Sequence, residues 1–69
     1  MYVKSQEVGG MTVRVGDRVE VDQPGVGGRP GVRGTFTVRS IESTHSGPTF
    51  YLEGPEFAIA HARGIRRVR

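Results

Sequence analysis

The chain has no cysteine and no tryptophan, and it has one lysine and one leucine among its 69 residues. Without cysteine, a disulfide framework, a thiolate nucleophile and a cysteine zinc site are all excluded. No apolar run approaches the roughly 18 residues that a membrane-spanning helix needs, so we expect no membrane partner. The first residues, 1–7, hold no apolar core and therefore predict no signal peptide, which favours a cytoplasmic protein.

The length also limits the kind of active site. A chain this short forms one domain at most, and such a domain buries only about 60% of the surface that its unfolded chain exposes. It has no room for a cleft between two domains or for a large ligand cavity.

What the chain does have is β-branched side chains: ten Val, three Ile and five Thr, against three Ala. These stiff side chains suit a pleated strand and lose rotamer freedom in a helix. Eleven Gly and four Pro interrupt the chain, and no stretch between them carries a helical apolar stripe. The composition therefore predicts an all-β domain of short strands joined by Gly-rich turns.

The N-terminal half divides into three predicted parts. Residues 1–10 are an N-terminal arm, and the folded domain occupies 11–69. Apolar and polar residues alternate through 11–21, interrupted at Gly16-Asp17. This dipeptide is either a hairpin turn or a kink before a strand at 18–22, and we prefer the kink because each arm of such a hairpin would be short. Five Gly and two Pro make 22–34 a long loop.

Three strands are predicted at 35–41, 49–53 and 56–60, with a polar turn at 42–48. Ile41 breaks the alternation of the first of them, which indicates either a bulge near Ser40 or a shift of facing at the strand end. A one-turn 3₁₀ helix at 61–64 precedes a last strand at 65–69. The predicted core is Val13, Val15, Val19, Val21, Phe36, Val38, Ile41, Phe50, Leu52, Phe57, Ile59, Ile65 and Val68.

Five short strands, one long early loop and a 3₁₀ turn before the last strand describe a small, partly open barrel. The string Val15-Gly16-Asp17-Arg18-Val19-Glu20-Val21 resembles the first strand of an SH3-like barrel of the KOW/Tudor kind. Gly31-Val32-Arg33-Gly34-Thr35-Phe36-Thr37-Val38 resembles its Gly-rich turn and second strand. The resemblance implies a five-stranded SH3-like barrel over about residues 13–68.

A wider pattern is similar to small uncharacterised proteins of phages and mobile elements. It consists of Gly34-Thr35-Phe36-Thr37-Val38-Arg39-Ser40-Ile41, then Tyr51-Leu52-Glu53-Gly54, then Ile65-Arg66-Arg67-Val68. The likeness implies nucleic-acid contact, protein docking or a phage accessory role in a bacterial host. The chain lacks the lysine-rich first loop of nucleic-acid-binding members, and it has too few surface aromatics for a methyl-lysine cage.

Catalytic chemistry has little support in the sequence. His45 lies in a polar turn and His61 in an Ala-rich turn, and neither has a carboxylate at metal-ligand spacing. Gly25, Gly27 and Gly28 are not followed by the helix that a phosphate-binding loop requires. We therefore predict a protein that is not an enzyme and that uses no cofactor or metal.

Arginine is the distinctive surface chemistry, since nine of the ten basic residues are Arg and the net charge is +3. A GC-rich bacterial or viral genome is an alternative source of this excess. If the 22–34 loop folds toward the C-terminal strand, its arginines join those near the C-terminus, and Tyr51 faces outward to stack a base. The candidate binding residues are Arg29, Arg33, Arg39, Tyr51, Arg63, Arg66 and Arg67.

Two functions stay open. The first is weak contact with the nucleic-acid backbone through these arginines. The second is a protein–protein module, a monomer or weak homodimer, that docks an acidic host or virion partner through the 22–34 loop and its strand edges.

Overall fold

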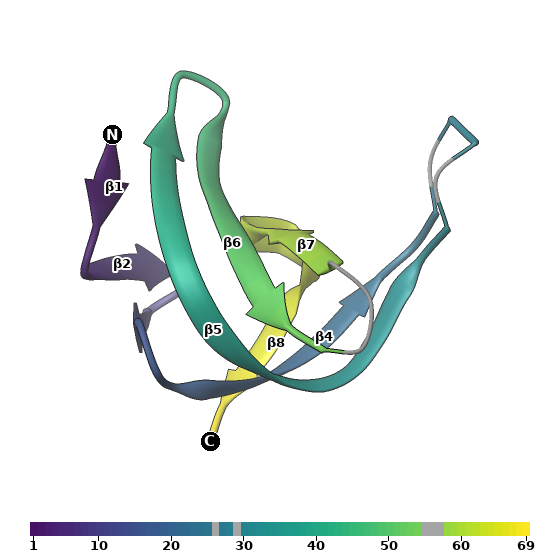
Figure 1. Ribbon diagram of the computed structural model, residues 1–69, viewed down its shortest axis with the longest axis horizontal. Helices are drawn as coiled ribbons and strands as arrows, with labels where there is room; N and C mark the ends of the chain where they lie inside the picture. Colours follow the sequence, from purple (N-terminus) through teal and green to yellow (C-terminus); the bar gives the residue numbers. More distant parts are fainter. Residues whose placement is uncertain (26, 29, 55–57) are drawn as a thin grey trace.

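The computed structural model describes residues 1–25, 27, 28, 30–54 and 58–69, and within them the chain is all-β, as predicted (Figure 1). The strands and the single 3₁₀ turn follow one another as β1 Tyr2–Val3, β2 Ser5–Val8, β3 Met11–Arg14, β4 Arg18–Gln23, β5 Val32–Thr44, β6 Gly47–Glu53, β7 Ala58–His61, η1 Ala62–Gly64 and β8 Ile65–Val68.

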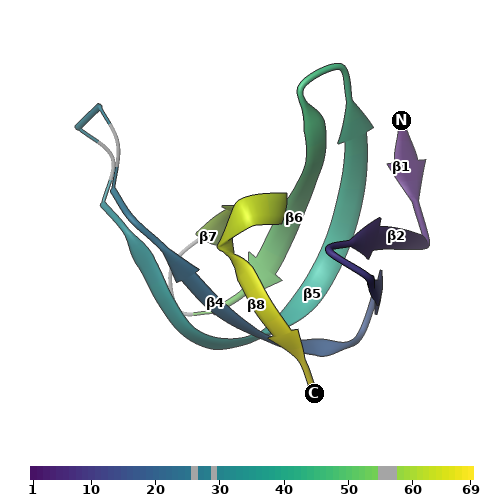
Figure 2. The same cartoon turned by 180° about the vertical axis from the view of Figure 1, so that it is seen from behind.

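The strands form one large and one small antiparallel sheet. The large sheet has the order β7-β6-β5-β4-β8, with β1 added to β5, and the small sheet pairs β2 with β3. The long strand β5 bends through the molecule, pairing its first half with β4 and its second half with β6 (Figure 1). From behind, η1 leads into β8, which returns to the other edge of β4 (Figure 2). Each of the five predicted strands has a counterpart in β4 to β8, and the predicted 3₁₀ turn is η1.

The predicted N-terminal arm is paired along most of its length. Strand β1 joins β5, with Val3 opposite Ile41, and β2 forms a hairpin with β3. Gly9 and Gly10 have φ of 53° and 81°. Positive φ at both central residues is what a two-residue hairpin turn of type I′ requires. The glycine pair therefore reverses the chain, and Val8, which was not predicted in the core, becomes buried.

The predicted kink at Gly16-Asp17 is confirmed, since β3 pairs with β2 whereas β4 pairs with β5 and β8. Gly16 has a φ of 96° and donates its N–H to Val38 O at 2.8 Å. The Asp17 carboxylate accepts the Arg14 N–H at 2.9 Å. Val15 lies where the chain turns, and it is 45% exposed. Its prediction as a core residue was wrong because the kink ends the alternation.

The predicted loop at 22–34 was too long. Strand β4 continues to Gln23 and β5 begins at Val32, with Asp22 opposite Arg33. Gly34 lies inside β5, because the backbone of a glycine can pair although it has no side chain to pack. The polar turn at 42–48 was also too long, because β5 continues through Thr44 and β6 begins at Gly47.

Two bulges shift which residues face the core. The pairing of β5 with β6 slips between Val38 and Ser40, so of the two predicted alternatives the bulge is the one that forms, and Arg39 is the extra residue. The pairing of β4 with β8 slips in the same way, and here Arg66 is the extra residue. Ile65 and Val68 therefore both turn inward despite a spacing of three.

The core lies between the bent large sheet, which includes β8, and the β2–β3 hairpin. Its buried members are Val8, Val13, Val19, Val21, Val38, Ile41, Phe50, Leu52, Ala60 and Ile65. Phe36 and Val68 are partly buried against it, and Phe57 lies outside the described residues. The prediction of Ile59 as a core residue was wrong: Ala60 is opposite Phe50 and buried, whereas Ile59 is opposite Tyr51 on the outer side.

Candidate functional site

The outer side of β4, β5 and β8 carries most of the charged side chains that the sequence singles out. Along β4 the outward positions are Arg18, Glu20 and Asp22. Register places Arg67 opposite Glu20, and Arg33 opposite Asp22. We call this surface the basic face; it consists of Arg18, Glu20, Asp22, Arg33, Arg63, Arg66, Arg67 and Arg69.

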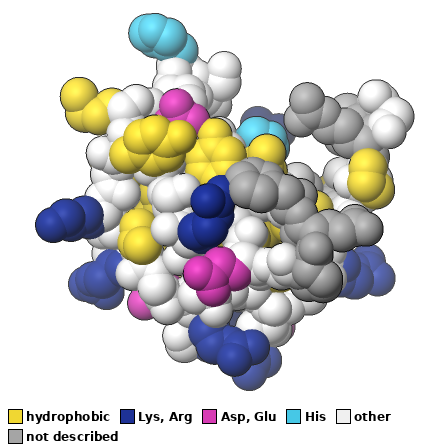
Figure 3. Space-filling model, in the orientation of Figure 1, with side chains coloured by type: hydrophobic (Ala, Val, Ile, Leu, Met, Phe, Trp, Pro, Cys, Tyr) yellow, Lys and Arg dark blue, Asp and Glu magenta, His cyan; other side chains and the backbone are white. Residues whose placement is uncertain are grey.

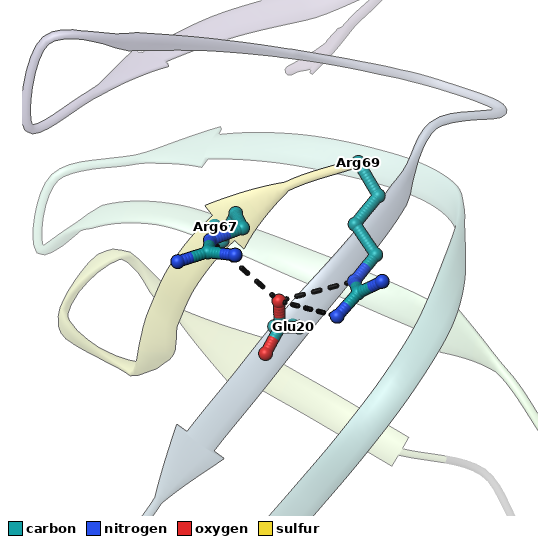
Figure 4. A network of polar contacts seen from close by, with 3 residues as sticks. All are labelled: Glu20, Arg67 and Arg69. Carbon is teal, nitrogen blue, oxygen red and sulfur yellow. Dashed lines mark hydrogen bonds and ion pairs between the residues drawn. The ribbon is translucent and has the colours of Figure 1, made fainter.

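Glu20 is the centre of the largest polar network on the basic face (Figure 4). Its Oε2 accepts from Arg69, with N–O distances of 3.0 Å to both Nε and Nη2, and lies 3.7 Å from Nε of Arg67. Two guanidinium groups thus share one carboxylate, so a positive charge is left over. Most of the Arg67 side chain, 71%, stays exposed.

Arg33 forms an ion pair with Asp22, with an Nε–Oδ1 distance of 3.3 Å. The side chain of Arg33 is 83% exposed. Exposed pairs of this kind contribute only about 0–1 kcal/mol. Arg33 and Arg67 can therefore exchange a carboxylate for another anion at little cost.

Arg63 and Arg66 lie together at the end of the basic face. Arg63 is in η1 and Arg66 is the bulge residue of β8. Both line a shallow concavity whose remaining walls come from Val8, Gly9, Met11, Ala62 and Ile65, so no carboxylate belongs to its lining within the described chain. Arg66 also borders a second concavity between β4 and β5, together with Arg33. The structure thus brings Arg33 close to Arg66, from strand β5 and not from the loop that the sequence predicts at 22–34.

Arg39 and Tyr51 are not among the residues that line either concavity. They lie across the β5–β6 pairing, with the Arg39 guanidinium carbon 5.9 Å from the centre of the Tyr51 ring. The Tyr51 hydroxyl donates to Glu42 Oε1 at 2.7 Å, and the Tyr2 ring is 6.4 Å away. We call Tyr2, Arg39, Glu42 and Tyr51 the tyrosine surface. Figure 3 shows hydrophobic side chains gathered over β1, β5 and β6, with basic and acidic side chains beside them.

The candidate residues from the sequence therefore divide into two groups. The basic face unites Arg33, Arg63, Arg66 and Arg67, whereas Arg39 and Tyr51 belong to the tyrosine surface. Arg29 lies outside the described residues.

Comparisons with protein-family models, with curated proteins and with solved structures find no match. In the part of the chain that the structure describes, no three His, Asp or Glu side chains come together as metal ligands, and no helix is long and apolar enough to cross a bilayer. Both histidines are exposed: His45 in the β5–β6 turn and His61 at the end of β7.

Sequence reasoning missed Val8 and Met11, which supply apolar wall to the concavity beside Arg63. A signal for them was available. Gly9-Gly10 joins two four-residue segments, and a pair of glycines between short segments is a strong indication of a two-residue hairpin turn.

The Tyr51 hydroxyl should titrate above its ordinary pKa of 10.0, chiefly because its hydrogen bond to the Glu42 carboxylate stabilises the neutral phenol. The stabilisation from this bond is complete below pH 10.0 and is lost as the pH rises through the higher pKa of the folded protein. In a Tyr2→Phe background Tyr51 is the last tyrosine, so phenolate absorbance reports on it alone. Adding Glu42→Gln should lower that midpoint.

Glu7→Gln is the matched control for this titration, because Glu7 lies in β2 and bonds to Thr12 rather than to a tyrosine. It should leave the phenolate midpoint where it was. An equal shift from both substitutions would attribute the effect to net charge and not to the hydrogen bond.

Proposed function

We propose that this protein is a small non-enzymatic module that binds the nucleic-acid backbone through its basic face. The observation that carries the proposal is the excess of arginine there. Arg18, Arg33, Arg63, Arg66, Arg67 and Arg69 stand against the two carboxylates of Glu20 and Asp22. Guanidinium groups suit phosphate oxygens because they stay charged and offer paired donors.

The fold that we propose for this module is an SH3-like, partly open barrel. Three features support it: the bent β5 shared between two partners, the 3₁₀ turn before the last strand, and the return of β8 to β4. The proposal extends to a phage-like accessory protein, on the resemblance of the strings around β5, β6 and β8.

The binding should be weak and strongly dependent on salt. Neutralising about three or four phosphates gives a slope of log K against log salt near −3 on a duplex, and a somewhat less negative slope on a single strand. Fluorescence anisotropy with a labelled oligonucleotide measures this slope directly. Arg66→Gln should weaken binding and make the slope less negative by about 1.

Arg14→Gln is the matched control, because it removes the same charge from β3, and Arg14 lines neither concavity. It should leave the affinity nearly unchanged. A slope near zero, or no binding at low salt, would reject the proposed function.

A second candidate, a protein-docking module, is favoured by the tyrosine surface. Tyr2 is 67% exposed and Met1 beside it is 87% exposed. Tyr and Arg are enriched among the residues that dominate protein interfaces. This candidate predicts no response to oligonucleotides, together with a sedimentation mass that rises with protein concentration or with an acidic partner and falls after Tyr2→Ser.

A further inference from the structure

The concavity beside Arg63 and Arg66 combines an apolar floor with a positive rim. Val8 and Ile65 form its base, being only 6% and 5% exposed, and half-buried Met11 lies next to them. At the rim, Gly9 has no side chain, and a Cβ built there would meet nothing within 4 Å. The accessible apolar surface of the floor therefore comes mainly from Met11, beside the β2–β3 hairpin turn, and no side chain of Gly9 covers it.

The charge on this rim is of one sign. Arg63 and Arg66 are both exposed, and the described lining offers them no carboxylate. A ligand that fits this concavity carries an anionic group that reaches the two guanidinium groups. It also carries an apolar part that covers Met11 and its neighbours. A nucleotide has both parts, a phosphate and a base.

We propose that the strand bound by the basic face is single-stranded, with one phosphate held by Arg63 and Arg66 and an adjacent unstacked base lying on the floor around Met11. This inference rests on the proposed function and names its substrate class. A duplex keeps its bases stacked and paired, so it can reach the arginines but leaves the floor empty. A single strand can turn a base outward onto a protein surface.

The second concavity extends the surface along which the bound nucleic-acid strand can run. Arg66 borders both concavities, so a backbone that leaves the floor reaches Arg33 next, between β4 and β5. Glu20 and Asp22 also line this second concavity, and each of them is paired with an arginine. The floor offers no aromatic ring within the described lining, and the polarisable thioether of Met11 takes its place. Contact of this kind does not read hydrogen-bonding edges, so the binding should tolerate any base sequence.

The test compares one labelled oligonucleotide as a single strand and as a duplex, with the intact protein, over a range of salt. The single strand should bind more tightly. Met11→Ser should lower its affinity about fivefold, through lost apolar contact, and leave both the salt slope and the duplex affinity unchanged. Met11→Leu, which keeps the apolar floor, should bind as the unaltered protein does.

Gly9→Asn provides a second variant that does not touch the core. Asn tolerates positive φ, and its side chain would stand at the open rim, so single-strand binding should again fall while duplex binding does not. Thermal unfolding of each variant separates a folding defect from a binding defect.

The outcomes distinguish the two proposals. Equal affinity for single strand and duplex, unchanged by Met11→Ser, would overturn the single-strand inference and leave backbone binding intact. Absence of binding to either form would overturn the proposed function itself. Tighter binding of a peptide with a free C-terminal carboxylate than of the oligonucleotide would overturn both and assign the concavity to that peptide.

Discussion

Replacing Phe50 by alanine should lower the free energy of unfolding by about 3–5 kcal/mol. Phe50 heads the fully buried side chains in volume, and it lies between Ile41 on β5 and Ala60 on β7. A chain of this length has a total stability of roughly 3–10 kcal/mol, at 0.05–0.15 kcal/mol per residue. The variant should therefore lose a large share of the total stability, and chemical denaturation followed by circular dichroism measures the loss.

Val15→Ala and Val13→Ala form the matched pair for this prediction. Both valines lie on the inward side of the sequence alternation, yet Val13 is fully buried and Val15 is 45% exposed. Val15→Ala should change the free energy of unfolding by less than about 0.5 kcal/mol. Val13→Ala should cost clearly more, and a similar loss at the two positions would contradict the kink at Gly16-Asp17.

The alternation of apolar and polar residues was enough to predict which side chains are buried where a strand is long or where one residue clearly breaks the alternation. Val19 and Val21 in β4, and Phe50 and Leu52 in β6, face inward as predicted. Ile41 breaks the parity of the predicted strand at 35–41, which indicates either a bulge near Ser40 or a shift of facing at the strand end, and the pairing of β5 with β6 shows the bulge.

The predicted direction of side chains, toward or away from the core, was wrong in short segments. There the register with the neighbouring strand decides which side chains face the core. In β7, Ile59 is the larger apolar residue, but the pairing with β6 turns the small side chain of Ala60 toward Phe50. No local pattern shows this, because the pairing with Phe50 and Leu52 of β6 decides which side of β7 faces the core. The buried Val8 was missed for a similar reason, since its burial depends on a glycine turn that reverses the chain.

The excess of arginine follows from the sequence, but the grouping of the arginines on the surface could not be predicted. Arg69 bonds to Glu20 across 49 positions of sequence, and such neighbours follow from strand register. Arg39 and Arg66 are each the extra residue of a bulge, so the alternation rule does not apply to either of them. These two displacements separate Arg39 from the basic face and place Arg66 between the two concavities.

The second large effect should come from Gln23, whose side chain joins the end of β4 to β7. Its Oε1 accepts the His61 N–H at 2.7 Å, and its Nε2 donates to Ile59 O at 3.2 Å. The carboxamide thus satisfies the outer edge of β7 as a neighbouring strand would. At about 0.5–1.5 kcal/mol for each hydrogen bond, Gln23→Ala should cost roughly 1–3 kcal/mol in the free energy of unfolding.

Gln23→Glu tests the direction of these bonds. At neutral pH it puts a carboxylate oxygen in place of the Nε2 donor, so two acceptors face each other at Ile59 O. Protonation restores a donor, so the pKa of the new glutamate should be raised in the folded protein. The loss relative to the unaltered protein should therefore be largest at neutral pH and shrink as the pH falls through that raised pKa. A deficit that does not vary with pH would contradict the donor role of Nε2.

Gly64→Ala should disrupt the same hydrogen bonds between Gln23 and β7, because Gly64 lies against the Gln23 side chain. A Cβ at position 64 would lie 2.8 Å from Gln23 Oε1 and 2.9 Å from Gln23 Cβ, which is too close for either atom to stay in place. Moving Gln23 costs both of its hydrogen bonds, so Gly64→Ala should be about as destabilising as Gln23→Ala. Because the two substitutions remove one shared contact, the double variant should lose less stability than the sum of the single losses. Strictly additive losses in denaturant titrations would mean that Gly64 is needed for another reason and that the edge of β7 is closed without it.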